Sequence, residues 1–190
     1  MSARLFVVAG PSGVGKGTLI AAARERLPGL VLATSATTRP RRPGERHGCE
    51  YYFLDPEDFA RRVQEGEFLE HVDYAGHRYG TLRSEVESRL ARGESVLLEI
   101  EVAGARAIKR LVPDAVLVFI APPSPSALEQ RLRSRKANTE GEIADRMRIA
   151  REELDAAPAF DHLIVNDRAD RAAGELIEII RTSLEEEDRT

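Results

Sequence analysis

Short apolar runs alternate with amphipathic stretches along most of the chain. The apolar runs predict buried strands at Leu5–Ala9, 30–34, 95–100, 115–120 and His162–Val165. The stretches between and after them have helical spacing at 15–27, 82–92, 102–109, 126–135, 140–156 and 171–186. Because strands that alternate with helices favour a parallel sheet, we expect an α/β fold whose sheet core is covered by helices on both faces.

Two stretches interrupt this alternation. Residues 35–82 are rich in Pro, Gly, Arg and aromatic residues, and their pattern predicts short strands at 51–54, 68–72 and 77–79 around a helix at Pro56–Gln64. This favours a small α+β insertion. Within 126–147, a polar, arginine-flanked segment at 136–141 predicts a short, mobile lid between two helices. Residues 1–34, 83–125 and 148–190 would then form the core of a single domain.

Composition narrows the class of protein. The 190 residues suit one globular unit, and 42% hydrophobic residues provide a core for it. A net charge of −4 argues against nucleic acid as a partner. The single cysteine, Cys49, excludes an internal disulfide and fits a reducing compartment. We find no apolar run long enough for a signal peptide or a bilayer span, so we expect no membrane partner and a cytoplasmic location.

A glycine-rich segment follows the first predicted strand and opens the first predicted helix. It consists of Gly10, Pro11, Ser12, Gly13, Val14, Gly15, Lys16, Gly17 and Thr18. Glycines let backbone N–H groups turn toward phosphate oxygens, and a lysine here reaches the β- and γ-phosphates. Gly17 occupies the usual Ser/Thr position, which leaves Thr18 as the nearest hydroxyl for Mg²⁺. The strand–loop–helix context predicts an ATP-binding P-loop rather than a glycine-rich turn with a surface lysine.

A second group of motifs is more specific. Residues 37–45 read TTRPRRPGE, and Gly48 and the run YYF at 51–53 follow them. The segments GEFLE, YGT, LEIE, IAPPS and IVND then occur in order at 66–70, 79–81, 98–101, 120–124 and 164–167. Together with the P-loop, these segments resemble the guanylate kinase family over nearly the whole chain. The resemblance implies Mg²⁺-dependent phosphoryl transfer from ATP to GMP, and dGMP stays open as a further acceptor.

The resemblance also assigns residues to GMP. Arg39, Arg42, Tyr51 and Tyr79 match the family's phosphate-binding residues, and a guanidinium suits bidentate capture of phosphate. Glu70 matches the carboxylate that reads the guanine N1–H and N2–H₂ donors. The family's base-reading hydroxyls and its remaining GMP residues correspond to Ser35, Thr81, Glu45 and Glu101. A carboxylate would repel the bare N1 acceptor of adenine, which explains a preference for guanine.

The catalytic side chains implied by the resemblance are cations. They are Lys16, Arg131, Arg135 and Arg146. The resemblance also places Asn166 in the ATP site, beside the adenine. We expect Mg²⁺ to be held by the ATP phosphates, with Thr18 and Glu101 contributing mostly through water. Relatives usually carry Asp at the position of Glu101 and Gly at that of Lys136. No general base is required, because a monophosphate is already an anionic nucleophile.

Two alternatives remain open at this point. A non-enzymatic guanylate-kinase-like binding module would lack the P-loop and the lid arginines. A kinase of a phosphorylated sugar, such as ribose bisphosphate, would keep the P-loop but lose the guanine-reading set around Glu70. The sequence does not give the oligomeric state.

Overall fold

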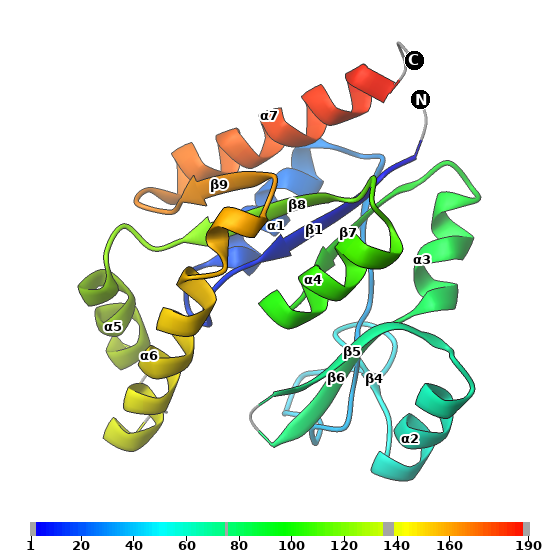
Figure 1. Ribbon diagram of the computed structural model, residues 1–190, viewed down its shortest axis with the longest axis horizontal. Helices are drawn as coiled ribbons and strands as arrows, with labels where there is room; N and C mark the ends of the chain where they lie inside the picture. Colours follow the sequence, from blue (N-terminus) through cyan, green and yellow to red (C-terminus); the bar gives the residue numbers. More distant parts are fainter. Residues whose placement is uncertain (1–2, 75, 135–138, 188–190) are drawn as a thin grey trace.

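The computed structural model describes residues 3–74, 76–134 and 139–187. Its core is a parallel sheet of five strands with the order β2-β7-β1-β8-β9 (Figure 1). The strands are β1 (Leu5–Ala9), β2 (Leu30–Leu32), β7 (Ser95–Glu99), β8 (Val116–Ala121) and β9 (His162–Val165). The predicted α/β class is therefore confirmed, and every core strand expected from an apolar run is present.

Helices cover both faces of this sheet because alternate strand residues point to opposite sides. Phe6 and Val8 of β1 pack with residues of α1, α5, α6 and α7. Val7 and Ala9 pack on the other face with residues of α3 and α4. The bounds are α1 (Lys16–Arg26), α3 (Arg83–Leu90), α4 (Val102–Leu111), α5 (Pro125–Ser134), α6 (Glu140–Leu154) and α7 (Ala169–Glu187).

A second sheet lies beside the carboxyl ends of the core strands, with the order β4-β3-β6-β5 (Figure 1). Its elements are β3 (Ala36–Thr37), β4 (Tyr52–Phe53), β5 (Phe68–Tyr74), β6 (His77–Leu82) and the helix α2 (Pro56–Gln64). Phe59 of α2 stacks on Phe68 with 4.4 Å between ring centroids. Asp55 caps α2 by accepting a hydrogen bond from the Asp58 N–H at 2.7 Å. This sheet has its own small hydrophobic core, separate from the two core clusters of the main sheet.

Several element ends differ from the sequence prediction. The strand expected over 30–34 ends at Leu32, and the N–H of Thr34 donates instead to Glu85 Oε1 of α3 at 3.2 Å. Strand β6 continues to Leu82, where a helix was expected to begin. Strand β3 and the short 3₁₀ helix η1 (Ala157–Ala159) were not predicted, because two or three residues carry no periodic signal. Thr139 and Glu142 form a capping box that starts α6.

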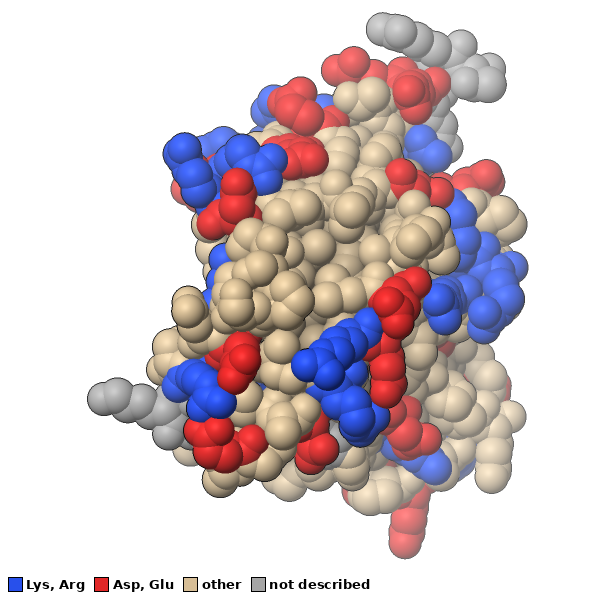
Figure 2. Space-filling view, turned by 60° about the vertical axis from the view of Figure 1, so that its left-hand side comes forward, with Lys and Arg blue, Asp and Glu red and all other residues tan. Residues whose placement is uncertain are grey.

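The predicted lid falls partly on positions whose structure is not described. Arg135 and Lys136 lie outside the described residues, so the lid segment remains a prediction. No described helix is long and apolar enough to cross a membrane. The face drawn in Figure 2 carries groups of both charge signs around a broad uncharged area.

Candidate active site

The phosphate loop connects the end of β1 to α1. Gly10, Gly13 and Gly15 have φ angles of 142°, 85° and 102°, which side chains rarely adopt. A Cβ atom at Gly10 would lie 2.2 Å from the carbonyl oxygen of Ile120. Gly15 is the N-cap of α1 and supplies no side-chain cap, and no acidic residue lies in the first turn. The loop therefore directs backbone N–H groups and the positive end of the helix toward a site suited to an anion.

Three side chains hold this loop in place. Lys16 is nearly buried, and its Nζ donates to the carbonyl oxygen of Gly10 at 2.6 Å. Asn166 Nδ2 donates to the carbonyl oxygen of Val14 at 2.8 Å. Arg131 joins these segments, since Nη1 donates to Val14 O at 3.0 Å and Nη2 to Asn166 O at 2.8 Å. In this structure Arg131 and Asn166 thus brace the phosphate loop, and their predicted contacts with ATP stay a prediction.

Two cavities meet at the ends of β1 and β7. The acceptor cavity, about 720 Å³, is lined by Ser12, Ser35, Arg39, Arg42, Glu45, Tyr51, Glu70, Val72, Tyr74, Tyr79, Gly80, Glu99, Ile100, Glu101 and Arg146. The phosphate-loop cavity, about 610 Å³, is lined by Ser12, Gly13, Gly15, Lys16, Gly17, Thr18, Leu32, Ala33, Ser35, Glu50, Tyr51, Glu99, Ile100 and Glu101. Several residues line both, Ser12 and Glu101 among them. Groups bound in the two cavities would therefore meet near the phosphate loop.

One part of the acceptor cavity is organised around Arg39. Its guanidinium forms a bidentate pair with Glu45, at 3.1 Å to Oε2 and 2.8 Å to Oε1. It also lies over the rings of Tyr51 and Phe53, 5.4 Å and 5.7 Å from their centroids. Glu45 additionally accepts from the backbone N–H of Arg42 at 2.8 Å, and these hydrogen bonds lower the pKa of Glu45. Glu45 therefore holds the Arg39 guanidinium and the backbone at Arg42, and the two arginines are the cations on this side of the cavity.

Another part of the acceptor cavity contains Glu70, which is only 5% exposed. Thr81 Oγ1 donates to Glu70 Oε1 at 2.8 Å. Glu70 Oε2 has no hydrogen-bond partner within the described part of the chain. Burial raises the pKa of Glu70 to about 7. An unpaired carboxylate oxygen in a cavity wall matches a ligand that brings N–H donors.

Thr81 is fully buried, and its hydroxyl donates to Glu70. In this structure Thr81 therefore positions Glu70, and its contact with GMP stays a prediction. Ser35 and Tyr79 line the acceptor cavity as the prediction requires.

Carboxylates gather at the junction of the two cavities. Glu99 ends β7, and Glu101 occupies the N-cap position of α4. Burial, together with the nearby charge of Glu101, raises the pKa of Glu153 of α6. The Oε2 atoms of Glu101 and Glu153 find no donor among the described residues. Burial also raises the pKa of Glu99, against the opposing charge of Lys16.

The metal prediction can be compared with this arrangement. No group of three or more His, Cys, Asp or Glu suited to a metal ion occurs in residues 3–74, 76–134 and 139–187. Glu101 has an unpaired carboxylate oxygen, and the exposed Thr18 lines the phosphate-loop cavity. Hard oxygen groups of this kind fit Mg²⁺ that keeps several waters and is bound chiefly by a nucleotide.

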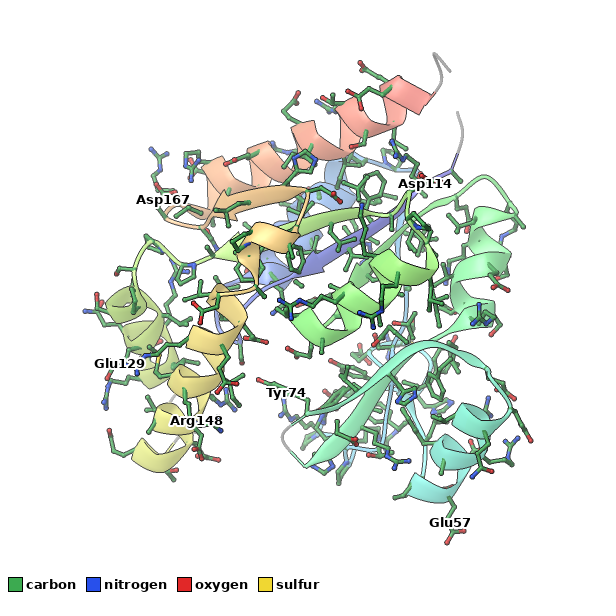
Figure 3. All side chains as sticks on the ribbon, in the orientation of Figure 1. Glu57, Tyr74, Asp114, Glu129, Arg148 and Asp167 are labelled. Atoms are coloured by element: carbon green, nitrogen blue, oxygen red, sulfur yellow. The ribbon has the colours of Figure 1, made fainter. Side chains whose placement is uncertain are left out.

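Sequence reasoning missed two residues of the site, Glu153 and Tyr74. Tyr74, at the end of β5, extends toward the core (Figure 3) and lines the acceptor cavity together with Ser12 of the phosphate loop. Burial raises the pKa of Tyr74 to about 12, and its ring lies edge-on to Tyr79 with 6.4 Å between centroids. Glu153 was concealed in a charged helix, and Tyr74 in a short strand, so neither gave a signal in the sequence. The predicted lid arginine Arg146 does line the acceptor cavity.

Comparison with known proteins places these features in a family. A family model described as guanylate kinase matches residues 2–183. A guanylate kinase of Frankia casuarinae is 50% identical over 93% of this chain and 96% of its own, and one of Synechococcus sp. (strain JA-3-3Ab) is 49% identical over 91% and 80%. The crystal structure of guanylate kinase from Anaplasma phagocytophilum is similar with a TM-score of 0.76 and 31% identity, covering 95% of this chain and 86% of that one. The chain belongs to the guanylate kinase family.

Proposed function

We propose that this protein is a guanylate kinase, which transfers the γ-phosphoryl group of ATP to GMP, reversibly and with Mg²⁺. One observation carries the choice of acceptor: the buried Glu70 leaves Oε2 unpaired in the wall of the acceptor cavity. Guanine offers adjacent N1–H and N2–H₂ donors that would satisfy this oxygen. Leaving a buried acceptor unpaired costs about 1–3 kcal/mol, which disfavours adenine in the same position.

The phosphate loop would bind ATP. Its backbone N–H groups and the start of α1 provide the positive potential for the phosphates. Lys16 donates to the loop carbonyl of Gly10 and is placed to exchange this bond for a phosphate oxygen. Asn166 and Arg131 keep the loop in the required shape, because both bond to the carbonyl oxygen of Val14. Mg²⁺ would neutralise and orient the ATP phosphates, with Glu101 and Thr18 as its protein neighbours, mostly through water.

GMP would occupy the acceptor cavity. Arg39, which pairs with Glu45, and Arg42 would bind its phosphate together with Tyr51 and Tyr79. Glu70 would accept hydrogen bonds from the guanine edge, while the Thr81 hydroxyl donates to the same carboxylate. Ser35 would offer its hydroxyl to O6.

In the transfer step, a phosphate oxygen of GMP attacks the γ-phosphorus of ATP. The bond from the γ-phosphorus to the bridging oxygen breaks, and ADP leaves with that oxygen. The nucleophile is already an anion, so positioning and charge neutralisation carry the reaction. We assign this role to four cations, namely Lys16, Arg131, Arg146 and Arg135, the last of which lies outside the described residues. The shared residues of the two cavities support direct transfer between bound nucleotides.

An ADP-release assay tests this proposal against the alternatives. We expect turnover with GMP and much less with AMP or ribose bisphosphate, and the same assay measures whether dGMP is accepted. Turnover of AMP or of ribose bisphosphate equal to that of GMP would overturn the assignment of the acceptor. No ATP binding at all would favour the non-enzymatic module. The exposed free thiol of Cys49 supports a cytoplasmic location, since it fits a reducing compartment.

A further inference from the structure

Helix α4 contains a glycine, Gly104, in its first turn. Gly104 is absent from the residues with positive φ, so the backbone does not require glycine here. Helical glycines also occur without close neighbours, as Gly174 does in α7, but Gly104 is buried and a Cβ atom there would be crowded.

The close contact would be with Glu70. A Cβ atom on Gly104 would lie 2.6 Å from Glu70 Oε2 and 3.1 Å from Glu70 Cδ. It would also lie 3.3 Å from Ile100 Cδ1. Real carbon–oxygen contacts of 2.6 Å do not occur between non-bonded groups, so the Glu70 carboxylate would have to move by on the order of 1 Å. The atom that would move is the unpaired oxygen of the acceptor cavity.

The carboxylate is held at its other oxygen, and the open space beside it is the acceptor cavity. Its other oxygen, Oε1, accepts from Thr81 at 2.8 Å, and the side chain is buried. Glu70 lies on β5 of the second sheet, while Gly104 lies on a helix of the core, and the two elements pack against each other. Because Gly104 has no side chain, the Glu70 carboxylate occupies the space beside it.

We propose that Gly104 is a positioning residue for acceptor recognition. Because it has no side chain, the Glu70 carboxylate can lie close to α4, and this position of the carboxylate determines the preference for guanine. This inference rests on the proposed function, in which Glu70 reads the base. Alanine at this position pushes Oε2 from the cavity wall toward the base, where its hydrogen bonds to N1–H and N2–H₂ no longer align. The phosphate loop does not include this contact, so ATP recognition is unaffected.

The test is Gly104→Ala, with Gly174→Ala as its matched control. Gly174 is also a helical glycine, in α7, but a Cβ atom there meets nothing within 4 Å. We expect Gly104→Ala to raise KM for GMP about tenfold, to leave KM for ATP within twofold, and to lower the ratio of GMP to AMP turnover. Gly174→Ala should change none of these. The thermal midpoint of Gly104→Ala should fall only modestly, because the added methyl group overpacks a buried site but the carboxylate that it meets is the flexible end of a side chain and can shift.

A second variant tests the geometry itself. Glu70→Asp shortens the side chain by one methylene, so alone it should reach the base poorly and weaken GMP. In the Gly104→Ala background it should fit beside the added methyl group, and the double variant should bind GMP more tightly than Gly104→Ala alone. This comparison also holds if Gly104→Ala folds poorly.

Three results would overturn the proposal: an unchanged KM for GMP in Gly104→Ala, an equal rise in KM for ATP, or a double variant no better than Gly104→Ala. Its failure is distinguishable from failure of the proposed function. If the parent enzyme prefers GMP but one of these three results is found, only the role of Gly104 is wrong. If the parent does not phosphorylate GMP, the proposed function is wrong.

Discussion

Glu70 provides a prediction about pH, because in the proposed function it binds GMP in its ionised form. Burial raises the pKa of Glu70 from 4.5 to about 7, which corresponds to about 3 kcal/mol against the ionised carboxylate in the folded protein. The guanine donors favour the carboxylate, so GMP binding should lower this pKa and release a proton. With a pKa of about 7, roughly one molecule in ten is ionised at pH 6 and most are at pH 8. GMP should therefore bind about tenfold more weakly at pH 6 than at pH 8 through Glu70 alone.

The assay is calorimetric titration with GMP between pH 6 and pH 8, in buffers of different ionisation enthalpy. The phosphate of GMP itself titrates near pH 6 and adds a slope of its own. Glu70→Gln separates the two contributions, since the amide can still accept from Thr81 Oγ1 but does not titrate. The variant should lose about tenfold of the pH dependence. An identical pH profile in parent and variant would refute the reasoning.

The same pKa has a consequence for stability without ligand. A carboxyl whose pKa is raised by folding contributes stability that is fully present below its unfolded pKa, near 4.5, and is lost as the pH rises through about 7. Relative to the parent, Glu70→Gln should therefore gain unfolding free energy between pH 5 and pH 8. Denaturant titrations of both proteins across this range measure the difference.

Substitutions at three further residues separate the parts of the site. Lys16→Ala should remove most turnover yet leave GMP binding, measured by calorimetry, largely intact; joint loss of GMP and ATP binding would contradict the two-cavity assignment. Glu45→Gln should loosen the bidentate contact with Arg39 and raise KM for GMP and AMP by the same several-fold factor, because both share the phosphate. Unequal factors would connect Glu45 to the base. Glu101→Gln should lower turnover at every free Mg²⁺ concentration while Glu101→Asp is tolerated, and full activity of Glu101→Gln would make that residue structural.

The core fold could be predicted because its signal is local. Each core strand is a short apolar run, and residues such as Phe6 and Val7 alternate between two helix-covered faces. The second sheet was harder to predict, since β3 is two residues long and is held by pairing with β4 and β6 instead of by its own pattern. The end of β2 was misplaced because a side chain of α3, Glu85, takes the N–H of Thr34.

The site was predictable only where residues form sequence motifs. The phosphate loop and the arginine-rich segment around Arg39 are contiguous, so their chemistry can be read directly. Glu153 and Tyr74 enter the site from distant elements, and their roles depend on contacts with Glu101 and Ser12 that no spacing encodes.

The structure adds contacts that the motifs do not give. Glu45 and Thr81, which the resemblance assigns to GMP, bond to Arg39 and Glu70, two further residues assigned to the ligand. Which partner a polar side chain selects is a tertiary property. It follows from burial and from competing donors, not from residue type.

The central claim is that the acceptor cavity selects GMP for phosphorylation by ATP. The most direct measurement is a competition in one vessel that contains the enzyme, Mg²⁺, limiting ATP, and equal concentrations of GMP, AMP, CMP, UMP and ribose bisphosphate, with the products resolved by chromatography. The account predicts that ATP is consumed almost entirely to form GDP, and that Lys16→Ala forms almost none. Appearance of another diphosphate or of a phosphorylated sugar in amounts equal to or above GDP would contradict it.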